Sequence, residues 1–247
     1  MANNSPDRVE ISIPDFDLSG TQKEALHRAL IWTKGYFDNI PAGTHIGGHG
    51  FDKTMRQAGM AAVIATGEGQ PIFLPVLTAM IMDVGRATTD PRSRTYQHGI
   101  LSREIIEAEL FDTLEILTSE DKDLVGNAVE DHPKLNENVR RSNLVEIAMD
   151  SDRLDCLGTL GPLRAAAWRS NIPLILPNET GTSHDDSEID TMWQDMAVRQ
   201  MGWMDMLWTT TAREIATPRV IAYRQYLQRL HQEASFSYQA YQQLGIS

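Results

Sequence analysis

The side chains best suited to chemistry lie in short segments that combine histidine, aspartate and basic residues. Neutral imidazoles and carboxylates bind the divalent metal ions of hydrolytic sites, whereas a lysine ammonium only donates hydrogen bonds and cannot bind a metal. Guanidinium groups bind phosphate or carboxylate through two hydrogen bonds. The segments are HGFDKTMRQA (49–58), AMIMDVGR (79–86), HGILSREII (98–106), AVEDHPKL (128–135) and LVEIAMDSDRLDCLG (144–158).

Composition excludes several other classes of site and partner. The single cysteine, Cys156, forms neither an intramolecular disulfide nor a cysteine zinc cluster and is interpreted as a buried thiol. The glycine-rich run PAGTHIGGHG (41–50) predicts a loop, and it lacks the preceding strand and the lysine-serine ending of a P-loop. A formal net charge of -12 repels nucleic-acid backbones, so the expected partner is a small molecule and not a nucleic-acid polymer.

Helical periodicity dominates the chain and predicts an all-α fold to position these segments. We expect helices over 21–37, 51–67, 73–85, 101–117, 119–132 and 143–158, a loop over 170–188, and two long helices over about 188–213 and 218–241. Thr21 and Glu24 have capping-box spacing, and Pro218 suits the first turn of the last helix. Residues 1–19 are interpreted as an N-terminal extension and 20–247 as one helical domain.

The ends and apolar runs of the chain predict a soluble protein without a membrane partner. The N-terminus MANNSPDRVE has no secretory pattern. The longest apolar run, near PIFLPVLTAMIMDVG, has about 14 residues, which is too short to span a bilayer. We therefore expect a cytoplasmic location. The tryptophan- and methionine-rich stretch near 188–213 predicts core or dimer packing, which leaves a homo-oligomer open.

Taken in order, the segments resemble the HD superfamily of metal-dependent phosphohydrolases over roughly residues 20–235. The resemblance implies a single HD-type helical domain with long C-terminal helices. Asp83 matches the aspartate of the His-Asp pair that names the family, and Asp152 matches its last metal-ligand aspartate. His98 and His132 match histidines that help bind substrate phosphate or a second metal in related members. His49 lies one helical turn before a ligand position.

Two positions depart from the family pattern. Lys53 stands where the first metal-ligand histidine belongs, and Met82 where the histidine of the His-Asp pair belongs. A thioether is a poor ligand for magnesium, manganese or iron(II), and an ammonium is none. Since buried carboxylates need partners, we hypothesise that the Lys53 ammonium replaces the cation between Asp83 and Asp152. The alternative is that Lys53 extends to solvent.

The cofactor and the activity therefore stay open at this point. The predicted cofactor is either none or a weakly held divalent metal, with Asp83 and Asp152 as doubtful ligands. A displaced ion held by His49, His98 and His132, with His45 nearby, is the competing hypothesis. The resemblance implies a hydrolase acting on a small phosphorylated or nucleotide-like molecule. A metal-free binding or interaction protein, or a metal-independent enzyme that uses Lys53, are the alternatives.

Three further basic residues have weaker predictions. Arg56 and Arg86 flank the expected pocket and are candidates for holding a phosphate or carboxylate. For Arg86, the simpler interpretation is a charge favoured by the dipole near a helix C-terminus. Arg153 and Asp155 are interpreted as an exposed pair.

Overall fold

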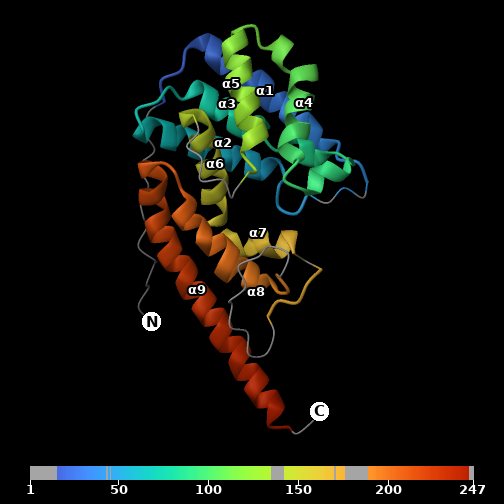
Figure 1. The fold of residues 1–247 in the computed structure, drawn as a ribbon, viewed down its shortest axis with the longest axis vertical. Helices are drawn as coiled ribbons and strands as arrows, with labels where there is room; N and C mark the ends of the chain where they lie inside the picture. Colours follow the sequence, from blue (N-terminus) through green and yellow to red (C-terminus); the bar gives the residue numbers. More distant parts are fainter. Residues whose placement is uncertain are drawn as a thin grey trace, which may run out of the picture.

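The chain folds into helices, and its computed structural model describes residues 16–42, 44, 46–134, 142–169, 171–175 and 189–244. Within these ranges every regular element is helical and no strand occurs, which confirms the predicted all-α fold. Helices α1 to α5 stand together at one end of the molecule, and α6 leads from them toward α7, α8 and α9 (Figure 1). No described helix is both long and apolar enough to cross a membrane.

Six helices build the part of the molecule that contains the motif segments, and their bounds follow the predictions closely at most ends. They are α1 (Gly20–Asp38), α2 (Phe51–Gly67), α3 (Phe73–Ile81), α4 (His98–Glu109), α5 (Ser119–Asp131) and α6 (Asn143–Cys156). Most of the predicted N-terminal extension lies outside the described residues, but Phe16 and Leu18 pack against the core.

Three of the predicted helices differ from the structure at their ends. Helix α1 is capped by Ser19, whose capping box uses Gln22, because Glu24 instead pairs with Arg28 one turn later. Helix α3 ends at Ile81 and continues as a 3₁₀ turn over Val84–Ala87. Helix α4 begins at His98 and stops at Glu109, since the chain must reverse before the cap of α5.

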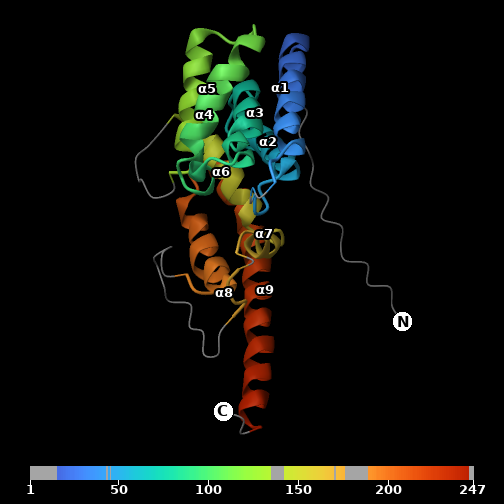
Figure 2. The ribbon, with the colours of Figure 1, turned by 90° about the vertical axis from the view of Figure 1, so that its right-hand side faces the viewer.

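Helix α3 is the central element of the fold. Seven of its nine residues are buried, as expected for a helix that is apolar on all sides. It packs against α1, α2, α5 and α6, and Figure 2 shows α1 to α5 grouped around it. Met82, directly after α3, is fully buried in the same apolar cluster. The burial of α3 therefore fixes the position of the next residue, Asp83.

The C-terminal third differs most from the predictions. Helix α7 (Gly161–Trp168) was not expected. In place of a long helix over 188–213 there are the short α8 (Met192–Gln194), a π-helix over Asp195–Gln200 and a 3₁₀ turn over Trp203–Met206.

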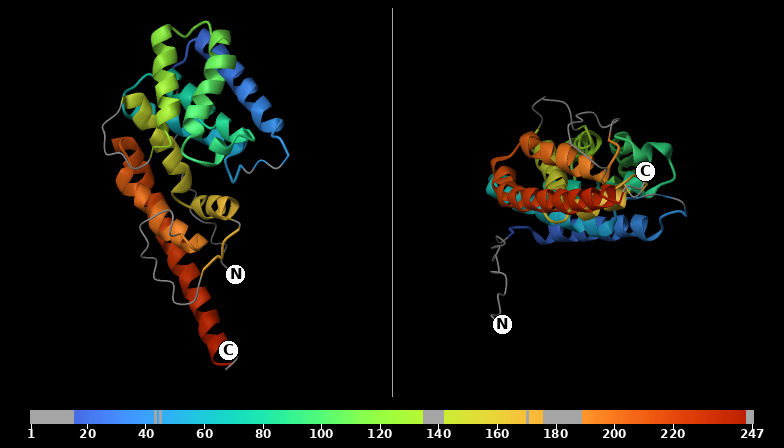
Figure 3. Two further views of the ribbon diagram at one scale, coloured as in Figure 1. Left: turned by 45° about the vertical axis from the view of Figure 1, so that its right-hand side comes forward. Right: turned by 90° about the horizontal axis from the view of Figure 1, so that it is seen from below.

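Helix α9 (Thr210–Gln242) begins at the cap Thr209, so Pro218 lies inside it and not in its first turn. The exposed ring of Pro218 costs one backbone hydrogen bond, which a helix of this length tolerates. The last turns of α9 extend beyond the rest of the described molecule (Figures 1 and 3).

Candidate functional site

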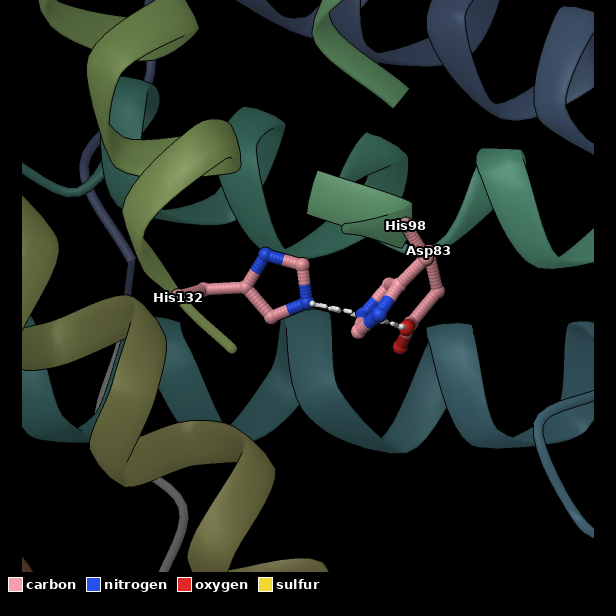
Figure 4. Close-up of side chains that lie close together, drawn as sticks. All are labelled: Asp83, His98 and His132. Carbon is pink, nitrogen blue, oxygen red and sulfur yellow. Dashed lines mark hydrogen bonds and ion pairs between the residues drawn. The ribbon is translucent and has the colours of Figure 1, made fainter. Parts of the chain in front are cut away.

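Five motif residues meet at the centre of the molecule, and each comes from a different helix or from the turn after it: Lys53, Asp83, His98, His132 and Asp152. Two close approaches make this possible. A Cβ on Gly99 would lie 2.5 Å from the carbonyl oxygen of Glu130, so glycine there lets the start of α4 reach the end of α5. A Cβ on Gly85 would lie 2.7 Å from the carbonyl oxygen of His98, so the turn after α3 also approaches α4 closely. Figure 4 shows the result, with Asp83, His98 and His132 facing one another.

The Lys53 ammonium lies between the two predicted carboxylates. Its Nζ is 2.5 Å from Asp83 Oδ2 and 2.8 Å from Asp152 Oδ1. The side chains of Lys53 and Asp83 are 1% and 3% exposed, so this ion pair is buried. Lys53 does not extend to solvent. The geometry is the one expected if its ammonium stands in for a cation.

The electrostatics of the cluster favour the ionised carboxylates. Burial alone would raise the pKa of Asp83, but the Lys53 ammonium and the hydrogen bonds to His132 and His98 hold it well below its usual range. Burial would likewise raise the pKa of Asp152, but Lys53 and then Arg164 lower it to about 2. Gln57 Nε2 donates a further hydrogen bond to Asp152 at 2.7 Å.

The two histidines face each other through their Nε2 atoms. Nδ1 of His98 lies 2.7 Å from the carbonyl oxygen of Thr95, and Nδ1 of His132 lies 2.6 Å from that of Val129. A carbonyl only accepts, so each Nδ1 donates to its carbonyl, and Nε2 is the ring nitrogen that each histidine turns toward the cluster. These Nε2 atoms are 3.0 Å apart, and Asp83 Oδ1 lies 3.3 and 3.7 Å from them.

This donor set fits a divalent metal ion. Asp83, His98 and His132 each offer one atom, and these atoms lie within 4.8 Å of one another. An ion about 2.1 Å from each donor requires donor separations of about 3.0 to 3.6 Å, and the observed values of 3.0, 3.3 and 3.7 Å agree. The backbone contacts at Nδ1 are the kind that orient metal-binding histidines.

The other predicted site residues are placed differently. His49 and Arg86 line the cavity described below, and Arg86 Nε lies 3.1 Å from Asp83 Oδ1. Arg56 is not among the lining residues, because its guanidinium is held by Asp155 and Asp52. His45 lies outside the described residues. His49 Nδ1 faces the carbonyls of residues 46 and 47, so its Nε2 accepts from Arg164 and is not turned to the Asp83 cluster.

Arg164 was not predicted from the sequence, and the prediction for Arg153 and Asp155 is wrong. Arg164 on α7 contacts Asp155 at 3.3 Å and Asp152 at 3.8 Å. Asp155 and Arg153 are both buried and do not form the predicted exposed pair, because Asp155 binds Arg56 and Arg164. The short run GPLRAAAW carries no motif, and Arg164 reaches the site because α7 packs against α6; Figure 1 shows α7 near the lower end of α6. Cys156 is buried, as predicted.

A cavity of about 380 Å³ opens beside the cluster, within the size range of small-molecule sites. Six arginines line it, in a chain whose formal net charge is -12. The Arg86 guanidinium stacks over the Trp168 ring at 5.2 Å, which fixes its orientation. The described lining residues that carry charge or an aromatic ring are His49, Arg86, Arg94, Tyr96, His98, Asp152, Arg153, Arg164, Trp168, Arg169, Arg199 and Trp203.

The helix arrangement, taken without the side chains at its centre, can be compared with solved structures. Comparisons of the sequence with protein-family models and with curated proteins gave no match.

Solved structures with this fold include a protein from Lactobacillus plantarum, with a TM-score of 0.65 and 18% identity over 89% of this chain and 99% of that one. YpgQ of Bacillus subtilis, solved in complex with ADP, has a TM-score of 0.64 and 21% identity over 86% and 96%. An HD-superfamily hydrolase from Bacillus thuringiensis has a TM-score of 0.60 and 18% identity over 86% and 97%. The chain therefore has the HD-type fold.

Proposed function

We propose that this chain is a phosphohydrolase of the HD type that acts on a small phosphorylated molecule. The observation that carries the proposal is the arginine-lined cavity beside Asp83, His98 and His132 in a chain that is strongly acidic overall. Guanidinium groups recognise phosphate through paired hydrogen bonds. Nucleotide-like ligands are the favoured class, since YpgQ of Bacillus subtilis was solved with ADP.

In this proposal Asp83, His98 and His132 hold one divalent ion. When bound, such an ion polarises a phosphoryl oxygen and lowers the pKa of a bound water. Arg86 and Lys53 place two fixed positive charges beside Asp83, where they favour a developing negative charge on the phosphoryl group. Asp152 and Gln57 hold the Lys53 side of the site in place. The family pattern implies a metal site built from histidines and aspartates. Because Lys53 replaces one of these histidines, the proposal places a single ion, at Asp83, His98 and His132.

A metal-free binding protein is the second candidate, and the position of Lys53 favours it. An ammonium 2.5 and 2.8 Å from the two carboxylates already satisfies Asp83 and Asp152 without an ion. A metal-independent enzyme that uses Lys53 as an electrostatic catalyst would have the same geometry.

One experiment separates these candidates. The metal content of the purified chain is measured, together with release of phosphate from AMP, ADP and p-nitrophenyl phosphate with Mn²⁺, with Mg²⁺ and with chelator. We expect hydrolysis that requires a divalent ion, and loss of both ion binding and hydrolysis in His132→Gln. The matched control His27→Gln, exposed on α1, is expected to leave both unchanged.

The other outcomes are equally specific. Absence of bound ion and of turnover would contradict the hydrolase proposal and favour a binding protein. Turnover that chelator leaves unchanged, but that Lys53→Ala abolishes, would identify the metal-independent enzyme.

A further inference from the structure

The charged side chains around the candidate metal ligands balance one another in charge. Three cations and three carboxylates alternate in one continuous series, and each contact between neighbours measures between 2.5 and 3.8 Å. This series, called the ion-pair network below, runs in the order Arg86, Asp83, Lys53, Asp152, Arg164, Asp155. Arg56 also contacts Asp155, but it has Asp52 as a second partner, so this outer pair leaves the balance unchanged.

Most of this network is shielded from water. The side chains of Lys53, Asp83 and Asp155 are 1%, 3% and 5% exposed, and that of Arg164 is 9% exposed. An uncompensated charge in such surroundings is costly, because water cannot solvate it and salt screens it poorly. The network therefore has no negative charge left over to attract an additional cation.

A divalent ion at Asp83, His98 and His132 would add two positive charges to this balanced network. A histidine that binds a metal ion is uncharged, so the two imidazoles cannot offset them. With a neutral side chain at position 53, the network would instead carry one negative charge in excess. Lys53 is therefore the residue that removes the attraction for an ion that arrives alone.

The cavity beside the network favours anions. Of the described residues that line it, six are arginines and one, Asp152, is a carboxylate. His98, Arg86 and Arg164 also line the cavity, so an anion held there lies next to the ion position. One phosphate oxygen can then bind the ion while others accept hydrogen bonds from guanidinium groups. Above its second pKa of about 6, a phosphate monoester carries two negative charges, which equal the charge that the ion adds, whereas a diester carries a single one.

We propose that the divalent ion and a doubly charged phosphate group bind this site together, and that the substrate is therefore a phosphate monoester and not a diester. Lys53 imposes this dependence, because its charge cancels the carboxylate charge that would otherwise hold the ion. Each of the two ligands then raises the affinity for the other by the same factor. The inference rests on the proposed function for the position of the ion, but it is tested by binding alone.

The test is equilibrium dialysis of Mn²⁺ against the full chain, with the same anion on both sides of the membrane so that complexes in solution cancel. The anions are inorganic phosphate and dimethyl phosphate at about pH 8, above the second pKa of a phosphate group. Both offer oxygens to the ion, but dimethyl phosphate has one negative charge at any such pH. We expect phosphate to raise the Mn²⁺ affinity roughly tenfold or more, and dimethyl phosphate to raise it less than about threefold.

Lys53→Gln removes the charge and keeps a side chain that can hydrogen-bond to both carboxylates. We expect it to bind Mn²⁺ without an anion roughly tenfold more tightly than the wild type, and to respond to phosphate by less than about threefold. Lys34→Gln is the matched control, since Lys34 pairs with Asp38 on the surface of α1, and it should keep the wild-type response. If Lys53→Gln does not fold, the contrast between the two anions in the wild type decides, because it needs no variant.

The proposal is overturned if phosphate leaves the Mn²⁺ affinity of the wild type unchanged, if dimethyl phosphate acts as strongly as phosphate, or if Lys53→Gln keeps the full response to phosphate. Coupled binding in a chain that hydrolyses no phosphate ester supports this inference and contradicts the hydrolase. Mn²⁺-dependent hydrolysis without coupled binding does the reverse. Failure of Mn²⁺ to bind with either anion contradicts both.

Discussion

Replacing Lys53 by alanine removes the positive charge that Asp83 and Asp152 share in the core. Removing one partner of a buried ion pair costs about 3–5 kcal/mol, because the remaining charge stays desolvated. Asp83 keeps Arg86 at 3.1 Å. Asp152 keeps a quarter of its side chain exposed. Both facts reduce the cost, so we expect Lys53→Ala to lower the free energy of unfolding by about 2–4 kcal/mol at pH 7.

The assay is urea unfolding followed by tryptophan fluorescence and by circular dichroism, with the slope compared between variants. Lys34→Ala is the matched control, since Lys34 also pairs with an aspartate, Asp38, but both side chains are more than half exposed. An exposed pair of this kind contributes less than about 0.5 kcal/mol. Both lysines pair with an aspartate, so the difference in unfolding free energy lost by the two variants reports the effect of burial and not of charge alone.

The loss of stability caused by Lys53→Ala should depend on pH in a defined direction. Lys53 holds the pKa of Asp83 well below its usual range and that of Asp152 at about 2, against the effect of burial. A carboxyl with a lowered pKa stabilises the fold above its unfolded pKa of about 3.9 and loses this contribution as the pH falls further. The difference between wild type and Lys53→Ala should therefore narrow below about pH 4.

A divalent ion should also stabilise Lys53→Ala more than the wild type, because the ion can then approach both carboxylates. The reasoning would be refuted by a loss below about 1 kcal/mol at pH 7 that is also independent of pH. Such a result would mean that water already solvates Asp83 and Asp152 in the folded chain.

Two further predictions concern histidine titration and close packing. Burial, and then Arg86, lower the pKa of His98 to about 3 and that of His49 well below its usual range. As the pH falls, both histidines therefore become protonated in the unfolded chain before they do so in the folded chain. The free energy of unfolding, measured with urea, should fall as the pH drops below about 6.5, by up to about 1.4 kcal/mol per pH unit for each histidine. His49→Asn should show a smaller dependence on pH, and an unchanged dependence would contradict this. Gly161→Ala should destabilise the fold by more than about 2 kcal/mol, because its Cβ would lie 2.3 Å from the carbonyl oxygen of Cys156. Gly59→Ala, with open space around it in α2, should instead stabilise by about 0.5–1 kcal/mol in thermal melts, and equal effects of the two glycine changes would refute the packing argument.

Local patterns were enough to predict much of the fold. Helices α2, α5 and α6 lie close to their predicted bounds, because apolar periodicity and capping residues act within one or two turns. Prediction failed where distant contacts decide the outcome. Asp150, on α6, accepts hydrogen bonds from the backbone of Trp208 and Thr209, which supports the start of α9 at Thr210 and places Pro218 inside it. No local pattern in 188–213 shows this constraint.

The sequence by itself determined which groups are available at the site. It contains the carboxylates of Asp83 and Asp152 and the imidazoles of His98 and His132, and it places Lys53 and Met82 where the HD pattern has histidines. These are matters of residue type, and they set what each side chain can donate, accept or bind.

Only the tertiary structure decided how these groups are used. It brought Lys53 between two carboxylates, turned Met82 into the core and placed the Nε2 atoms of His98 and His132 beside Asp83. The tertiary structure also brings arginines from α7 and from the π-helix to one cavity, although the segments between them carry no motif. The reason is physical: a buried charge is positioned by partners that lie far away in the sequence, and a local pattern cannot show which partners these are.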